Sequence, residues 1–221
     1  MAGSRPRICV ALTGDDPAAV TAVEPLTDYY EVRIDLIGTA WREVAGRLRR
    51  PWIATNRRRE EGGAWQGSED DRIDELLAAL ELGAAIVDIE LAAPGLPNLL
   101  RRGKARALYL VSYHNMERTP PLDELQGIVA RMKAAGADLC KVVTNARSFG
   151  DNLTMLQLIR AFPGLDMVAF AMGEAGKLSR VLSPLAGAFF TFASASAGTE
   201  SAPGQVTAAE LRALYGTLGY G

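Results

Sequence analysis

The 221-residue sequence predicts an α/β protein, a (β/α)8 TIM barrel that forms a single domain over residues 1–221. Eight short apolar runs alternate with eight helical stretches, and strict alternation implies parallel strands joined by crossover helices. No linker and no change of composition divides the chain. An open doubly wound sheet is the alternative. It usually carries a glycine-rich turn after its first strand, and residues 12–16 match that turn poorly.

The individual elements follow from local signals along the chain. Apolar runs bounded by turn residues predict strands at residues 7–12, 29–37, 51–55, 85–91, 107–113, 137–145, 166–172 and 188–193. Asp16 before Pro17 starts a helix, residues 68–71 form a capping box, and Thr207 caps the last helix. The other helices are predicted at residues 40–50, 97–102, 121–135, 152–162 and 177–186.

The composition is that of an ordinary globular protein, with 48% hydrophobic and 23% charged residues. A net charge of −2 argues against nucleic acid or a membrane surface as the partner. No apolar run is long enough to cross a bilayer, and no signal-peptide segment follows the N-terminus, so we expect a cytoplasmic protein. Cys9 and Cys140 lie in apolar runs and are expected as free thiols, and the single histidine, His114, argues against a zinc site.

One lysine lies in the middle of a predicted buried strand. Lys141 is flanked by Cys140 and Val142 within the apolar run of residues 137–145. Burial disfavours the charged form of a lysine and makes its amine a nucleophile, as in Schiff-base enzymes. Alternatively, the strand lies at an edge, or the ammonium group reaches water. For an isolated lysine we would favour that alternative, but the neighbouring strands change the balance.

Charged residues on the other strands are expected to point into the barrel. In a parallel barrel the outward positions pack against helices and must be apolar, so the charged parity of residues 29–37 faces inward. The same alternation recurs in the fourth and fifth strands, where Ser112 shares a face with His114. Either a structural ion-pair network or an active site explains so many buried charges. The inward set is Glu31, Arg33, Asp35, Arg57, Asp88, Glu90, His114 and Lys141.

For Asp35 and Glu90, a structural ion pair and a catalytic role both stay open, whereas Lys141 beside His114 favours catalysis.

With short motifs placed one at each strand end, the chain resembles the type I 3-dehydroquinate dehydratases along nearly its whole length. Asn56 and Met116 depart from the family, which usually has an apolar residue and often phenylalanine at these two positions. Residues 191–201 are about two residues longer than in many relatives, which leaves the role of Phe192 open. The motifs are Glu31-Val-Arg33-Ile-Asp35, Thr55-Asn-Arg57, Glu60-Glu61-Gly62-Gly63, Asp88-Ile-Glu90-Leu91, Ser112-Tyr-His114-Asn115, Lys141, Met172-Gly173, Ser179-Arg180 and Ser201-Ala-Pro-Gly-Gln205.

The resemblance implies loss of water from 3-dehydroquinate to give 3-dehydroshikimate in the shikimate pathway, with no metal and no organic cofactor. Lys141 would form an imine with the substrate ketone, and His114 would act as base and then as acid. Glu61 would orient His114, with Asp88 and Glu60 as alternatives. The resemblance also implies that two copies of the chain can form a homodimer.

The remaining site residues implied by the resemblance bind the substrate. Arg180 would bind its carboxylate, for which a planar guanidinium is suited. Glu31, Arg33 and Arg57 would bind ring hydroxyls. Met172 either lines the pocket or simply packs in the core. Ser201 and Gln205 would close over the ligand from residues 194–204, a run of small and polar residues that is either a lid or a plain connection. The full binding set is Glu31, Arg33, Arg57, Met172, Arg180, Phe192, Ser201 and Gln205.

Three other functions remain open from the sequence. A class I aldolase would also use a lysine imine, but a sugar-phosphate aldolase needs a phosphate site near strands seven and eight, where Glu174 would repel the phosphate. A magnesium-dependent lyase would use Asp88 and Glu90 as ligands with Lys141 as base. A barrel that only binds an anion or a protein is disfavoured, because such a scaffold has no need for so many buried charges.

Overall fold

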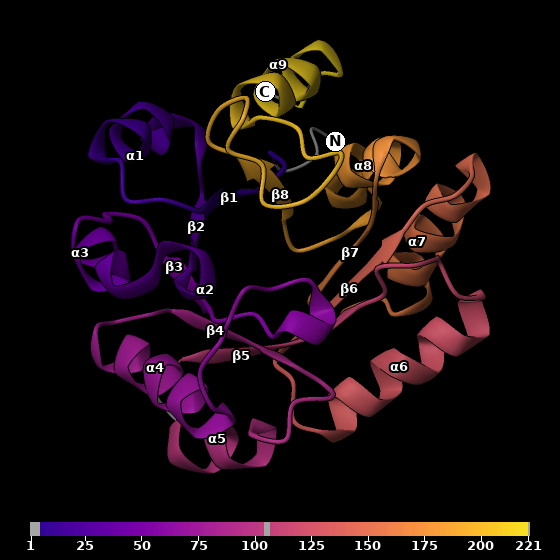
Figure 1. Cartoon of the computed structure of the whole chain (residues 1–221). Coiled ribbons are helices and arrows are strands. Elements are labelled where there is room, and N and C mark those ends of the chain that lie inside the picture. The colour runs from indigo at the N-terminus through magenta and orange to yellow at the C-terminus, as the bar shows by residue number, and fades with distance from the viewer. Residues whose placement is uncertain (1–4, 104–106, 221) are drawn as a thin grey trace.

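The computed structural model describes residues 5–103 and 107–220, so the ends of the predicted domain, residues 1–4 and 221, lie outside the described residues. Eight parallel strands form the centre and helices surround them (Figure 1), which confirms the predicted (β/α)8 barrel. The strands are β1 (Ile8–Leu12), β2 (Tyr29–Arg33), β3 (Trp52–Thr55), β4 (Ile86–Glu90), β5 (Leu108–His114), β6 (Leu139–Asn145), β7 (Met167–Met172) and β8 (Thr191–Ser194). The helices are α1 (Pro17–Val23), α2 (Ile34–Ile37), α3 (Trp41–Gly46), α4 (Glu69–Glu81), α5 (Leu96–Gly103), α6 (Leu122–Ala134), α7 (Phe149–Ala161), α8 (Lys177–Ala186) and α9 (Ala208–Thr217).

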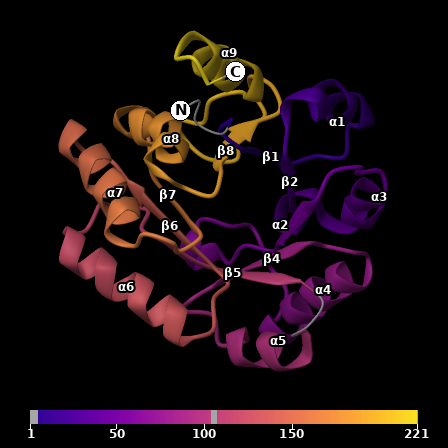
Figure 2. The same ribbon diagram turned by 180° about the vertical axis from the view of Figure 1, so that it is seen from behind.

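The strand order is β7-β6-β5-β4-β3-β2-β1-β8, so chain neighbours pair in parallel around the sheet and β1 pairs with β8. Seen from behind, the same ring of helices encloses the strands (Figure 2). Within the described ranges, no ladder joins β7 to β8, although the Phe189 N–H donates to the Met167 carbonyl at 2.7 Å. The barrel is therefore nearly closed, with a seam between β7 and β8.

Two apolar layers support the fold. The larger one lies between the strands and the helices and includes Val32, Val87 and Val142. The smaller one fills the interior of the barrel. At the N-terminal ends of the strands it forms a floor of Cys9, Ile53, Ile86, Leu110, Leu139, Val168 and Phe190. Because inward positions recur every two residues, the next inward positions of most strands lie above this floor, and they carry the polar side chains of the site.

The structure shows capping hydrogen bonds at the predicted helix starts. Asp16 accepts the Ala18 N–H at 2.9 Å, and Ser68 forms a capping box with Asp71. Thr207 does the same for α9. Helix α7 begins at Phe149, earlier than the predicted residue 152, because Ser148 caps it with Asp151. That signal is present in the sequence, and with it the start of α7 is predictable.

The second strand is shorter than predicted. It ends at Arg33, and a one-turn helix, α2, follows, so the prediction of a strand to residue 37 is wrong. Asp35 therefore does not extend the inward row. Its carboxylate accepts hydrogen bonds from Nε and Nη2 of Arg33 at 2.9 and 2.7 Å, and from the Ala64 N–H at 3.0 Å. Leu36, expected under the helices, is 41% exposed. The local ion pair outweighs the alternating pattern here.

Candidate active site

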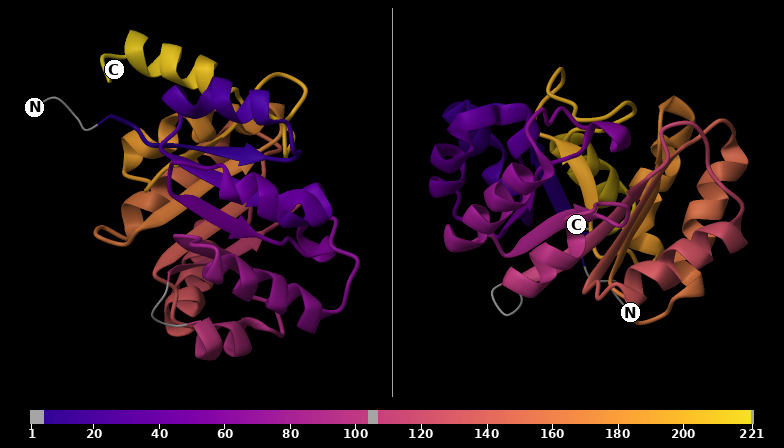
Figure 3. Two further views of the ribbon diagram at one scale, coloured as in Figure 1. Left: turned by 90° about the vertical axis from the view of Figure 1, so that its left-hand side faces the viewer. Right: turned by 60° about the horizontal axis from the view of Figure 1, so that its bottom comes forward.

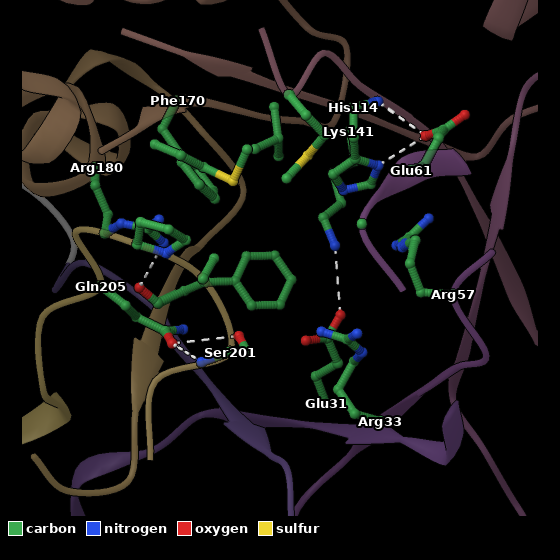
Figure 4. A pocket seen from close by; sticks show the side chains of 17 residues that line it. Glu31, Arg33, Arg57, Glu61, His114, Lys141, Phe170, Arg180, Ser201 and Gln205 are labelled. Carbon is green, nitrogen blue, oxygen red and sulfur yellow. Dashed lines mark hydrogen bonds and ion pairs between the residues drawn. The ribbon is translucent and has the colours of Figure 1, made fainter. Parts of the chain in front are cut away.

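A pocket opens at the C-terminal ends of the strands, where barrel enzymes carry their sites (Figure 4). Loops close over this end of the barrel, as the side views show (Figure 3). The pocket has a polar wall from β2 to β5. Its other wall, from β6 to β8, consists of apolar side chains among which Lys141 and Arg180 project. Its lining includes the predicted residues Glu31, Arg33, Arg57, Glu61, His114, Lys141, Met172, Arg180, Phe192, Ser201 and Gln205.

Lys141 lies at the centre of the pocket on β6, with 4% of its surface exposed. Its Nζ donates to Asp88 Oδ2 at 2.9 Å and to Glu31 Oε1 at 3.3 Å. The same Nζ lies 4.2 Å from the ring centroid of Phe192. Two carboxylates and an aromatic ring therefore contact the amine, and a ligand can reach it from the pocket.

A buried ion-pair network next to Lys141 joins the strands. Arg57 Nη2 donates to Asp88 at 2.6 Å, and Arg57 Nη1 donates to Glu90 at 3.1 Å. Arg72, on α4, donates to the other Glu90 oxygen at 2.9 Å and is fully buried. Although burial alone would raise the pKa of Asp88, Arg57 and Lys141 hold it well below its usual value. The oxygens of Asp88 and Glu90 are thus engaged by protein donors, which counts against the alternative in which they bind magnesium.

His114, at the end of β5, is held by Glu61. Glu61 Oε2 accepts both the backbone N–H and the ring Nδ1 of His114, each at 2.9 Å. We assign the proton to Nδ1, since the facing oxygen is an acceptor, and this leaves Nε2 free to take a proton. Burial lowers the pKa of His114 well below its usual value, and Arg57 and Lys141 lower it further. The imidazole is therefore neutral at neutral pH and available as a base.

The two alternatives to Glu61 lie elsewhere. The Glu60 side chain is 69% exposed and pairs with Arg58. Asp88 contacts Lys141, Arg57 and Ser112. Burial raises the pKa of Glu61 to about 7, and Arg57 opposes this shift. Among the three carboxylates, Glu61 is the one in contact with His114.

A tight loop places Glu61 against His114. Gly62 has a φ of 79°, which is costly for residues other than glycine. A Cβ on Gly63 would lie 2.0 Å from the Arg57 carbonyl oxygen, so this close approach also requires glycine. The Ala64 N–H then donates to Asp35, which ties the loop to Arg33 on β2. Asp35 therefore lies outside the pocket lining and has a structural position, where it links Arg33 to the loop that carries Glu61.

Arg180, on α8, reaches into the pocket as a buried cation. It is 1% exposed, and its Nη1 is 3.5 Å from the Phe192 carbonyl oxygen. Its Nε and Nη2 have no hydrogen-bond acceptor among the described residues. Burial lowers its pKa below the usual value. Such a site favours an anion, and a planar carboxylate matches the free donors of a guanidinium.

The loop after β8 covers one side of the pocket. Gln205 Oε1 accepts the Ser201 N–H at 2.7 Å and its hydroxyl at 3.2 Å, so the two predicted residues hold each other. Met172 and Phe192 lie on the apolar wall and are 5% and 4% exposed. Met172 thus both packs in the core and faces the pocket.

Sequence reasoning missed several residues that line or support the pocket. Phe170 precedes Met172 by two residues on β7, so the alternation that placed other side chains inward would also have placed it there. Val143 follows Lys141 in the same way. Arg72 lies on a helix, and no strand pattern signals that it reaches inward. Met116 and residues 202–203 come from loops, whose path over the pocket no periodicity reports.

Taken together, the pocket offers the groups that imine chemistry requires. It has a buried amine, a neutral imidazole oriented by a carboxylate, and a cation without an anionic partner in the described ranges. A ketone that also carries a carboxylate and hydroxyl groups matches this arrangement.

Comparisons with known proteins agree with this chemistry. A sequence model of type I 3-dehydroquinase matches residues 8–221. A 3-dehydroquinate dehydratase of Dehalococcoides mccartyi is 41% identical over 215 residues, which span 97% of each chain. The crystal structure of a type I 3-dehydroquinate dehydratase from Clostridium difficile with covalent modified comenic acid has a TM-score of 0.86 at 24% identity, covering 98% of this chain and 93% of that one. The crystal structure of a 3-dehydroquinate dehydratase from Geobacillus kaustophilus has a TM-score of 0.84 at 26% identity, and the match covers 98% of this chain and 92% of that one.

Proposed function

The chain belongs to the type I 3-dehydroquinase family, and we infer from this that it dehydrates 3-dehydroquinate to 3-dehydroshikimate in the shikimate pathway. Lys141 is the nucleophile. Lys141 first passes one proton to His114, and its amine then adds to the ketone carbon. The resulting carbinolamine takes that proton back from His114 as it loses water, which gives a protonated imine. The positive charge stays close to Asp88 and Glu31, which lie 2.9 and 3.3 Å from Nζ in the free protein. The imine withdraws electrons and acidifies the neighbouring C–H bond.

His114 carries the proton through the elimination. Its Nε2 takes the proton from the carbon next to the imine and then gives it to the hydroxyl group that leaves from the following carbon. Glu61 orients the ring through Nδ1 and stabilises the imidazolium that forms in between. Hydrolysis of the conjugated imine by water then releases the unsaturated ketone and the free lysine. The net change is the loss of one water molecule from the substrate.

Binding residues fit the two walls of the pocket. Glu31, Arg33 and Arg57 line the polar wall and bind ring hydroxyl groups. Arg180 binds the substrate carboxylate with its free donors. Met172 and Phe192 face the ring from the apolar wall, and Ser201 and Gln205 cover the ligand from the loop after β8.

The proposal has wider parts. The chain is one domain over residues 1–221, acts in the cytoplasm without metal or organic cofactor, binds no nucleic acid and forms a homodimer. Among the described helices, none is long and apolar enough to cross a membrane.

The observation that carries the proposal is the ring of groups around Lys141 within a chain that matches its family nearly end to end. Turnover of 3-dehydroquinate by purified protein, with and without EDTA, tests it. Lys141→Met should abolish turnover, and His114→Ala should lower it by roughly 10²–10⁴-fold. Lys177→Met is the control, because that lysine is half-exposed and pairs with Glu174. Wild-type turnover in Lys141→Met, or loss of wild-type turnover in EDTA, would contradict the proposal.

A further inference from the structure

In the described part of the chain, Arg180 has few of the polar partners that usually fix a buried guanidinium. Its backbone is anchored, because the Thr191 hydroxyl donates to the Arg180 carbonyl at 2.7 Å. Among the described residues, its side chain makes one long hydrogen bond, from Nη1 to the Phe192 carbonyl at 3.5 Å. Within the described part of the chain, Nε and Nη2 have no acceptor. The protein groups that position the guanidinium are therefore mainly ones that pack against it without a hydrogen bond.

The ring of Phe170 fills this role geometrically. The Arg180 Cζ lies 4.1 Å from the centroid of the Phe170 ring, within the range of a cation–π contact. Phe170 is 3% exposed and sits on β7 across the seam from Phe192 on β8. In Figure 4 the side chains of Phe170 and Arg180 lie beside each other at the same wall of the pocket.

The rings of Phe170 and Phe192 each contact one cation of the site. Phe192 faces the Lys141 Nζ at 4.2 Å, and Phe170 faces Arg180. The rings contact each other with centroids 6.1 Å apart and planes tilted by 60°. Both rings are buried in the barrel interior, where close packing restricts their movement relative to each other.

We propose that Phe170 is a positioning residue that holds Arg180 and so fixes the distance between the carboxylate-binding guanidinium and the imine-forming lysine. The residue thereby selects ring ketones that carry a carboxylate at a matching distance. This inference rests on the proposed function, in which Arg180 binds the carboxylate and Lys141 the ketone. It adds a specificity role for a side chain that touches neither reacting atom.

Steady-state kinetics of four variants separates the possibilities. Phe170→Leu removes the aromatic face, whereas Phe170→Tyr keeps it. Phe190→Leu is the packing control, since Phe190 is buried in the same interior layer and its ring contacts Phe192 rather than either cation. Arg180→Gln reports on the carboxylate contact itself. Thermal melts of every variant establish that each is folded at the assay temperature.

For Phe170→Leu we expect KM for 3-dehydroquinate to rise on the order of tenfold, with kcat within about threefold of wild type. Phe170→Tyr and Phe190→Leu should keep KM within about threefold of wild type. Borohydride trapping gives a second readout. The preference for labelling by 3-dehydroquinate over a cyclohexanone without a carboxylate should fall on the order of tenfold in Phe170→Leu.

The outcomes distinguish this inference from the function beneath it. If Arg180→Gln raises KM and Phe170→Leu does not, Phe170 has no positioning role and the inference fails alone. If Phe190→Leu raises KM as much as Phe170→Leu does, the effect is one of packing and the inference also fails. If Arg180→Gln leaves KM unchanged, the carboxylate assignment in the proposed function is wrong.

Discussion

At the scale of residues, the site depends on how each buried charge is compensated. Lys141 faces Asp88 and Glu31, and Arg57 is held between Asp88 and Glu90. Removing one partner of a buried pair typically costs about 3–5 kcal/mol, because the other charge remains desolvated. The carboxylates of this network therefore contribute both to stability and to the chemistry of the site. Variants at Asp88 would change both, so they cannot separate the two effects.

Glu61 offers a cleaner test, through pH. Its raised pKa of about 7 means that it gains a proton as the pH falls through neutrality. A protonated Glu61 no longer stabilises the imidazolium of His114, so kcat/KM should fall below a pH of about 7. Glu61→Gln should lower the rate and abolish this limb, and Glu60→Gln, at an exposed carboxylate, should keep it. Retention of the same limb in Glu61→Gln would assign the titration to another group.

Asn56 is a residue-scale anomaly with a stability prediction. It is fully buried, and neither its amide nitrogen nor its oxygen has a partner in the described ranges. Asn56→Val should therefore stabilise the protein by about 1–3 kcal/mol, which corresponds to a Tm increase of roughly 2–10 °C. Asn152 is the matched control, because it is equally buried but bonds to the Ala175 carbonyl and the Ser179 N–H.

Thermal melts of both asparagine variants decide the matter. Asn152→Val should lower Tm, because it leaves buried partners unsatisfied. A decrease in Tm for Asn56→Val similar to that for Asn152→Val would mean that the Asn56 amide is paired after all.

At the scale of elements, the sequence predicts best where a strict period governs. The parity of β4, β5 and β6 placed Asp88, His114 and Lys141 on the inward face, and the structure has them there. Prediction failed where a specific contact overrides the period, as at Asp35, whose pairing with Arg33 ends β2 early. It also failed for Arg72, since a helical residue that crosses a layer leaves no periodic signal.

The loop after β8 gives an element-scale prediction. Gln205 holds the loop closed on itself by accepting from Ser201 twice. Gln205→Ala should raise KM by roughly 30-fold, since two hydrogen bonds of about 1 kcal/mol each are lost, while imine formation persists at saturating substrate. Glu200→Ala, on the exposed part of the same loop, should behave as wild type.

Proteolysis separates a lid from a plain connection in the same loop. We expect saturating ligand to protect residues 194–204 of the wild type from cleavage, and to protect Gln205→Ala less. Equal cleavage of the wild type with and without ligand would show that the segment is only a connection.

At the scale of the whole molecule, the barrel separates support from chemistry along its axis. The apolar floor packs the N-terminal half of the interior, and the charged residues occupy the C-terminal half. In that half, the central network joins three acidic and three basic side chains, and Arg72 also pairs with Glu69 on its own helix. Arg180 lies outside this network and has no acidic partner among the described residues, so one ligand carboxylate can neutralise its charge. The acidic residues of the network are Glu31, Asp88 and Glu90, and the basic ones are Arg57, Arg72 and Lys141.

The central claim is that this barrel assembles an imine-forming lysine at position 141. Mass spectrometry after borohydride reduction in the presence of 3-dehydroquinate tests it most directly. We expect the protein to gain the mass of one reduced ligand, and peptide mapping to place the added mass on Lys141. The sample without ligand should gain nothing. Labelling at a different lysine, or no labelling under conditions of full turnover, would contradict the account.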